Sequence, residues 1–484
     1  MNSRMKTTLH FCLACSLSCF VFSGCSRSEE GALKDVGEYT AEIKHHPQDE
    51  TAYVNRGLAY SELKEHDKAI SDFTKAHELD AADPDPLYDR AMEYQDMAEA
   101  DEDAADDDNT TGDTDKLKAR AKSEHEKAVA DYTLAIKLNP KDPDAFHNRA
   151  LEQARLSHYK EAIADYTTAI TIDPTDSGAY YDRGIAYHEM KNDDLALKDY
   201  NQAIALDAND PIPYSQRAIV YEDRDNYGQA IEDLSKAIQL DPDNAQRYDD
   251  RGQAYTQDDN YKNAIDDFTH AISLDADDSD YVYHRAEAYS ADNQIDKAIE
   301  DYDACIRMNA RDAAAFGGRG ACYMDAKNYT KAVADYTKAI ELDGKNADNY
   351  SDRSLALLKK GEWDKALADA NQAIKLDPKD PDGWTDRGWI YATHAKYKEA
   401  IADANKCLAL DPESADGWDT LGYSQFGLHQ YDLALDDLTK AIKLDPKEGS
   451  FYYHRGQVYE KLGKDKDAYK DKHMADELLY SHEG

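Results

Sequence analysis

The sequence predicts an all-α protein built from tandem helix-turn-helix repeats, and three observations support this prediction. An aspartate recurs along the chain, and from Asp131 to Asp471 each copy follows the previous one after 34 residues. An arginine precedes this aspartate by 16 residues in ten of the twelve copies, and an alanine precedes it by three residues in all twelve. A fixed period of this length is typical of stacked repeat units, each of them a small group of helices or strands.

Each repeat has two helical faces when its arginine is numbered position 7. Position 8 holds only glycine, alanine or serine, position 20 only alanine, and position 27 only alanine or cysteine. Positions 4, 8 and 11 share one side of a first helix, and positions 20, 24 and 27 share one side of a second. Small side chains there allow the two helices to pack closely. Asp-Pro and Asn-Pro pairs after the second helix mark its end.

This pattern resembles the tetratricopeptide repeat, a helix-turn-helix unit, over residues 50–482. The resemblance implies twelve repeats stacked into a right-handed superhelical solenoid. The second repeat carries 25 extra residues, because Arg90 precedes its aspartate by 41 residues, and this insertion falls at about 98–122. Ahead of the repeats, residues 25–49 are expected to form a tether and a capping helix, since the terminal units of a repeat array need a cover.

The insertion is strongly acidic, which raises the question of a calcium loop. Gly112 can occupy the sixth position of such a loop, but the twelfth position is then Lys118, where the geometry requires a bidentate glutamate. A solvated acidic loop between two lengthened helices is therefore the favoured interpretation.

The N-terminus is expected to direct the chain to a membrane. A basic start precedes a 14-residue apolar stretch, residues 9–22, which is too short to span a bilayer. The small residues before Cys25 resemble a bacterial lipoprotein signal, which implies that residues 1–24 are removed and that Cys25 is lipidated. Ordinary cleavage and an uncleaved anchor are the alternatives. Because Ser26 follows the cysteine, the resemblance implies the outer membrane, facing the periplasm, with the cell surface and the inner membrane as alternatives.

Composition and charge limit the partners. The chain has 57 Lys and Arg residues against 99 Asp and Glu, a net charge of -42. Such an excess repels nucleic acids and anionic membrane surfaces, so only the lipid anchor is expected to touch a membrane. The 35 tyrosines indicate a folded core, because disordered chains are poor in aromatic residues. The expected partners are other proteins or peptides with basic or apolar segments, and the oligomeric state is left open.

No pattern in the sequence indicates catalysis. The chain has no glycine-rich phosphate loop, no HExxH and no GxSxG, and its 16 histidines are scattered. Cys305, Cys322 and Cys407 lack the spacing of a metal site, and we expect them to be small buried side chains. We therefore expect no enzymatic activity, no cofactor and no metal site.

A partner site is predicted on the first helices. The resemblance implies that positions 2, 5, 6, 9, 12 and 13 line a concave groove, and in this sequence every repeat has acids among these positions, whereas the only bases there are Arg155, Lys359 and Lys461. They either bind basic partners or simply keep an exposed face solvated. One stretch is less polar and suits an extended or helical peptide. It comprises Leu355, Leu358, Trp389, Tyr423 and Phe426. The alternative is that these five side chains fill space between neighbouring helices.

The arginine at position 7 is expected to form a buried or half-buried pair with the aspartate at position 23, since a guanidinium binds a carboxylate bidentately. Whether the pair lies within one repeat or joins two repeats is left open. The structural pairs that we single out are Arg56 and Asp72, Arg149 and Asp165, Arg251 and Asp267, and Arg387 and Asp403.

Together these features predict a non-enzymatic, lipid-anchored scaffold that presents a concave acidic groove to partner proteins during assembly of the cell envelope. That role is implied by the resemblance to repeat-containing lipoproteins. The alternative is an adaptor or regulator that docks a cell-wall enzyme.

Overall fold

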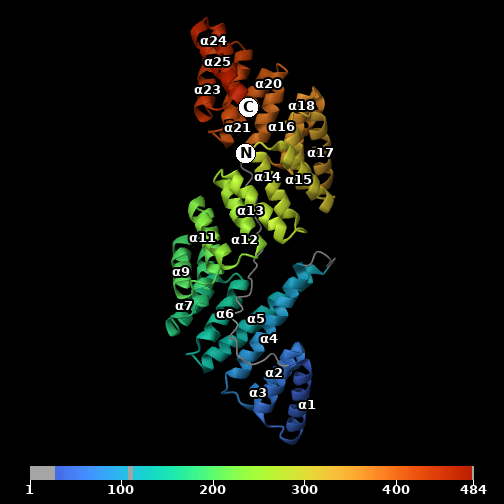
Figure 1. Ribbon diagram of the computed structural model, residues 1–484, viewed down its shortest axis with the longest axis vertical. Helices are drawn as coiled ribbons and strands as arrows, with labels where there is room; N and C mark the ends of the chain where they lie inside the picture. Colours follow the sequence, from blue (N-terminus) through green and yellow to red (C-terminus); the bar gives the residue numbers. More distant parts are fainter. Residues whose placement is uncertain (1–27, 107–112, 482–484) are drawn as a thin grey trace. The chain divides into compact units, whose positions relative to one another are not determined.

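The structure is a computed structural model that describes residues 28–106 and 113–481. Within these ranges the chain forms 25 α-helices that follow one another as helix-turn-helix pairs, so the predicted all-α repeat array is confirmed (Figure 1). The predicted signal segment, residues 1–24, and Cys25 lie outside the described residues, as do residues 107–112 of the acidic insertion. None of the described helices combines the length and the apolar character needed to cross a membrane.

The chain divides into two compact units, Met1–Asp243 and Asn244–Gly484. The helices of the first unit are α1 (Glu29–His45), α2 (Glu50–Glu62), α3 (His66–Leu79), α4 (Asp85–Asp106), α5 (Thr114–Leu138), α6 (Pro143–Arg155), α7 (Tyr159–Ile172), α8 (Ser177–Glu189), α9 (Asp193–Leu206), α10 (Ile212–Glu222) and α11 (Tyr227–Leu240).

The helices of the second unit are α12 (Ala245–Gln257), α13 (Tyr261–Leu274), α14 (Ser279–Ala291), α15 (Ile295–Met308), α16 (Ala313–Asp325), α17 (Tyr329–Leu342), α18 (Ala347–Lys359), α19 (Trp363–Leu376), α20 (Pro381–Thr393), α21 (Tyr397–Leu410), α22 (Ala415–Gly427), α23 (Tyr431–Leu444), α24 (Gly449–Lys461) and α25 (Asp465–Ser481).

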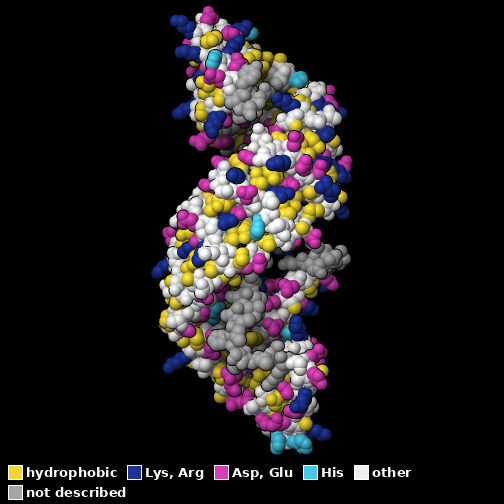
Figure 2. All heavy atoms as spheres, in the orientation of Figure 1, with side chains coloured by type: hydrophobic (Ala, Val, Ile, Leu, Met, Phe, Trp, Pro, Cys, Tyr) yellow, Lys and Arg dark blue, Asp and Glu magenta, His cyan; other side chains and the backbone are white. Residues whose placement is uncertain are grey.

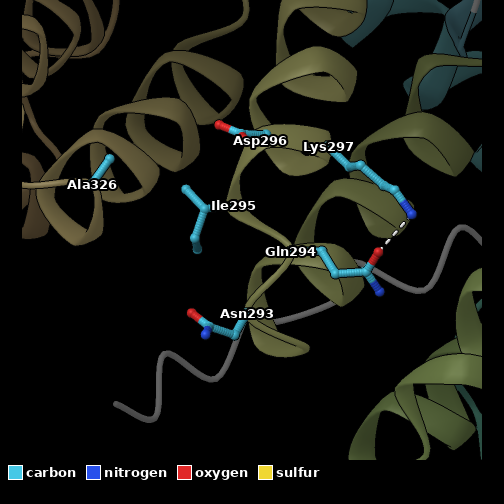
Figure 3. Close-up of a pocket in the computed structure, with 6 residues that line it drawn as sticks. All are labelled: Asn293, Gln294, Ile295, Asp296, Lys297 and Ala326. Carbon is cyan, nitrogen blue, oxygen red and sulfur yellow. Dashed lines mark hydrogen bonds between the residues drawn. The ribbon is translucent and has the colours of Figure 1, made fainter. Parts of the chain in front are cut away.

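The ends of the helices follow from local chemistry. Most first helices begin after an Asp, Asn or Ser whose side chain accepts a hydrogen bond from the backbone of the first turn, as Asp176 does from the Ala179 N–H at 3.1 Å. Position 15, between the first and second helix, has a left-handed backbone. Asn293, labelled in Figure 3, has a φ of 59° at this position. In two other repeats the residue at position 15 is a glycine, Gly361 or Gly463, which adopts this conformation without strain. This one residue turns the chain back along the first helix.

In most repeats the core forms where a small residue at position 8 meets a large one at position 24. A Cβ atom added to Gly252 would lie 2.6 Å from Cε1 of Phe268, a ring that is only 1% exposed. Alanine at position 20 packs beside the same ring, and in this repeat Ala264 and Phe268 form one cluster with Ala288 of the following repeat. The core is therefore a chain of small clusters that join neighbouring repeats, as expected for a repeat array.

The extra residues of the second repeat lengthen both of its helices. α4 has 22 residues and α5 has 25, whereas the standard first and second helices have 13 and 14. Ion pairs hold the lengthened part together: Arg120 binds Asp101 across the two helices, and Arg155 of α6 binds Glu99 and Glu102 of α4, each at 2.8 Å. The insertion thus extends an existing helix pair.

Candidate functional site

The arginine at position 7 binds the aspartate at position 23 of its own repeat through two parallel hydrogen bonds. In the repeat of α20 and α21, Nε and Nη2 of Arg387 each donate to Asp403 at 2.7 Å. The third donor, Nη1, reaches the preceding repeat, where it meets Asn371 Oδ1 at 2.7 Å. The pair itself is therefore internal to the repeat, and the same arginine also joins two repeats.

The other singled-out pairs have the same geometry. The distances from Nε and Nη2 to the two carboxylate oxygens are all 2.7 Å in the pairs Arg56 with Asp72, Arg149 with Asp165, and Arg251 with Asp267. The arginine side chains are 17–19% exposed and the aspartates 7–10%. These mostly buried ion pairs are part of the scaffold and leave little surface for a ligand.

One repeat lacks the arginine and shows how the carboxylate is then satisfied. Leu421 occupies position 7, and Asp437 accepts hydrogen bonds from Gln425 Nε2 and Lys440 Nζ, both at 2.9 Å. A buried carboxylate without donors would be costly. The substitution is therefore compensated by two neighbours, one from each helix of the pair.

A second set of hydrogen bonds links position 5 of one first helix to position 6 of the next, 35 residues later. The partners are His147 with Asp182, Asp249 with His284, Ser351 with Asp386, and Asp419 with His454. Histidine occurs on either side of this contact. Sequence reasoning treated the histidines as scattered, and the recurring separation of 35 residues is the signal that could have connected them.

These contacts alter the charge of the first-helix face. Burial lowers the pKa of His147, but hydrogen bonds to Asp176 and Asp182 outweigh it and raise the pKa to about 10. Burial opposes the charge of His284 in the same way, and its bond to Asp249 leaves the pKa raised. His147 is therefore cationic at neutral pH and neutralises part of the acidic surface.

Three aromatic rings from successive repeats meet on the first helices of the second unit. The ring centre of Trp389 on α20 lies 5.3 Å from that of Tyr423 on α22, and the His454 ring on α24 lies 5.6 Å from Trp389 and 4.7 Å from Tyr423. His454 Nδ1 is 2.8 Å from Asp419 Oδ1, which fixes its ring. We call Trp389, Tyr423 and His454 the aromatic cluster. Trp389 and Tyr423 are half-buried, so part of each ring is accessible.

Two of the other predicted partner-site residues pack against the core. Leu358 packs against the core cluster that contains Leu357 and Ile390, and Phe426 packs against Leu438 and Val458. Leu355 is half-buried on α18. Of the five predicted residues, Trp389 and Tyr423 are in ring contact, and the prediction from sequence does not include His454.

Acids occupy the same first helices as the aromatic cluster, and one of them, Asp419, contacts His454. Burial raises the pKa of Asp386 to about 8, and the charges of Asp352, Asp382 and Asp416 add to this effect. Burial raises the pKa of Asp416 to about 6, helped by Asp419 and Glu448. An approaching cation would relieve this repulsion. Figure 2 shows acidic side chains on the visible face of each unit, with Lys and Arg interspersed.

The cysteines lack the environment of a nucleophile. Cys305, Cys322 and Cys407 are buried, and burial raises the pKa of the Cys305 thiol to about 12. Each stays protonated at neutral pH and packs as a small apolar side chain. Residues 107–112, which the calcium-loop interpretation of the insertion requires, lie outside the described residues.

Comparison with known families identifies the repeats. Models described as tetratricopeptide repeat or TPR repeat match residues 51–82, 154–191, 177–210, 211–244, 245–278, 279–312, 313–346, 351–415 and 428–463. No curated protein matches the chain.

Several solved structures are similar to parts of the chain. A tetratricopeptide repeat protein from Parabacteroides merdae has 20% identity and a TM-score of 0.46, covering 51% of this chain and 98% of its own. YrrB, described as a TPR protein with an unusual peptide-binding site, has 25% identity and a TM-score of 0.30, covering 37% and 92%. Yeast Tom70 has 16% identity and a TM-score of 0.41, covering 87% and 95%.

The family matches extend over most of residues 51–463 and coincide with the helix pairs of the structure. The chain therefore belongs to the tetratricopeptide repeat family, whose members are generally non-enzymatic scaffolds for protein–protein interaction.

Proposed function

We propose that the chain is a lipid-anchored scaffold of the bacterial cell envelope, and that it binds a partner protein at the aromatic cluster. The observation that carries the binding site is the convergence of Trp389, Tyr423 and His454 from three successive first helices. Rigid aromatic side chains supply a large contact area at a low entropic cost, and they are enriched among the residues that dominate binding energies.

The acids around the cluster favour a partner segment that combines an apolar anchor with basic residues. Burial raises the pKa of Asp386 and of Asp416, and the charges of neighbouring carboxylates raise both further. A lysine or arginine of the partner would relieve that repulsion, while an apolar side chain would cover the accessible part of Trp389. An extended or helical peptide fits this description, because both forms present anchors at regular spacing.

Replacing Trp389 by alanine is expected to weaken partner binding about 30-fold, which corresponds to about 2 kcal/mol for a central aromatic anchor. A pull-down from crosslinked membranes identifies the partner, and calorimetry then compares its affinity for the wild type and for the variant. Recovery of one stoichiometric cell-wall hydrolase would indicate the adaptor role.

The matched control is Tyr469→Ala, which removes an aromatic side chain that is 71% exposed in the same unit. This variant should bind like the wild type. Trp389→Ala should also keep the melting temperature nearly unchanged, and a large decrease would show that the ring serves packing instead.

The lipid anchor is proposed from the sequence around Cys25. Replacing Cys25 by alanine is expected to move the protein to the soluble fraction or to leave it unprocessed, because the acylated cysteine would carry the only membrane attachment. Fractionation, followed by mass spectrometry of the N-terminal peptide, measures this. If the variant is cleaved normally and remains bound to membranes, the anchor is not at Cys25.

A further inference from the structure

Two junctions between repeats in the first unit differ from the rest of the chain. At most junctions, position 17 of one repeat is aromatic and position 10 of the next is small or apolar. Figure 3 shows a junction of the second unit, where Ile295 occupies position 17 and Ala326 of the next repeat lies beside it. In the first unit a histidine occupies position 17 twice, and a glutamate occupies position 10 of the following repeat each time.

Each histidine contacts its glutamate. His66 Nδ1 lies 2.8 Å from Glu93 Oε2, and His125 Nδ1 lies 2.7 Å from Glu152 Oε2. Glu93 is 2% exposed and Glu152 is fully buried. The second helix of one repeat is thus joined to the first helix of the next by a polar contact that replaces aromatic packing.

The two junctions differ at position 13, where the second has Arg155 and the first has Asp96. Around His125 a second cation offsets acidic charge, because Arg155 binds Glu99 and Glu102 at 2.8 Å and His125 Nε2 lies 3.2 Å from Glu102. Around His66 an acid, Asp96, takes the place of this cation. The first junction therefore lacks the cation that compensates the acids of the second.

The first junction also places metal-ligating atoms close together. One atom each from His66, Glu93 and Asp96 can be chosen so that all three lie within 4.8 Å of one another. Asp96 is exposed, which leaves the group open to solvent.

We propose that His66, Glu93 and Asp96 bind a divalent transition-metal ion of the Zn²⁺ type. An imidazole nitrogen with two carboxylate oxygens suits zinc and its neighbours, whereas calcium and magnesium prefer oxygen ligands alone. Bonds of about 2.0–2.2 Å around a tetrahedral ion separate its ligand atoms by about 3.3–3.6 Å. The distance between His66 Nδ1 and Glu93 Oε2, now 2.8 Å, would increase slightly on metal binding. The proton that these two atoms share would be released. Three protein ligands leave the fourth coordination position of the ion for a water molecule. Because His66 lies on α3 and the two carboxylates lie on α4, the ion would join these two helices.

The test is titration of the full chain with Zn²⁺ in the presence of excess Mg²⁺ and Ca²⁺, which occupy unspecific acidic sites. One Zn²⁺ ion per chain should bind in competition with a chromophoric chelator. His66→Ala and Asp96→Arg should each weaken binding at least about 10-fold. Asp96→Arg reproduces the residue of the compensated junction, so this variant should fold normally, which circular dichroism checks.

The matched control is Asp325→Arg, which makes the same charge change at position 13 of another repeat. There Ile295 and Cys322 stand at the positions of His66 and Glu93, so zinc binding should equal that of the wild type. The proposal is overturned if the wild type binds no Zn²⁺, if His66→Ala and Asp96→Arg bind it as well as the wild type, or if Asp325→Arg weakens binding equally.

Discussion

Replacing Arg387 by leucine is expected to lower the free energy of unfolding by about 3 kcal/mol, because it leaves a buried carboxylate without its main donors. Asp403 is 8% exposed and accepts two hydrogen bonds from this arginine, which also donates to Asn371 of the preceding repeat. Removing both charges with Arg387→Leu and Asp403→Asn should cost less than the sum of the single changes, with a coupling of about 1–3 kcal/mol.

Denaturant unfolding of the full chain, with hydrogen exchange in α20 and α21, measures these effects where they occur, because distant repeats of an array unfold separately. Arg311→Leu removes an exposed arginine and should change stability by less than about 0.5 kcal/mol. Asp369→Asn should show no coupling to Arg387, since Asp369 binds Arg353. Small and additive effects for Arg387 and Asp403 would contradict a structural role.

The repeat fold could be predicted because its determinants are local and recur at one spacing. The small residue at position 8, the alanine at position 20 and the proline after the second helix each act within a single helix pair. The separation of 16 residues between Arg387 and Asp403 also lies within one pair, so it suggests the contact directly. The contact of Arg387 with Asn371 could not be predicted, because it depends on how one repeat packs on the previous one.

The candidate sites depend mostly on such contacts between repeats. Asp419 and His454 belong to successive repeats and contact each other. Their separation of 35 residues predicts this contact only if it is already known that position 5 of one first helix faces position 6 of the next. The sequence groups Leu358 with Trp389 because both are predicted on the groove side of the first helices. Position 12 turns far enough toward the second helix that Leu358 packs into the core. The ligands of the proposed zinc site come from two helices of different repeats and match no sequence motif.

The stability of the chain is expected to fall as the pH rises toward 8, and Asp386 should account for a measurable part of the decrease. Burial, together with the charges of Asp352, Asp382 and Asp416, raises the pKa of Asp386 from 3.8 to about 8. The folded chain therefore holds this proton up to about pH 8, whereas the unfolded chain loses it near pH 4. Between these values the folded state binds more protons, so the free energy of unfolding decreases with increasing pH.

Replacing Asp386 by asparagine should remove this contribution. The variant should resemble the wild type near pH 4, where both side chains are neutral, and should be more stable by about 2 kcal/mol at pH 9. For a fully desolvated carboxyl, a pKa shift from 3.8 to about 8 corresponds to more than about 5 kcal/mol of unfolding free energy. We expect a smaller effect because Asp386 is partly exposed to solvent. Asparagine can still accept the hydrogen bond that Ser351 donates, so the contact between repeats is retained.

Denaturant unfolding at several pH values compares the two proteins, and contributions from all other groups cancel in the difference. Asp364→Asn removes an exposed acid from α19 and should give a difference that does not change with pH. A constant difference for Asp386→Asn would show that this carboxylate is ionised in the folded chain. Because a basic partner would stabilise the ionised form, its binding to the wild type should release a proton near pH 7, and its binding to Asp386→Asn should release less.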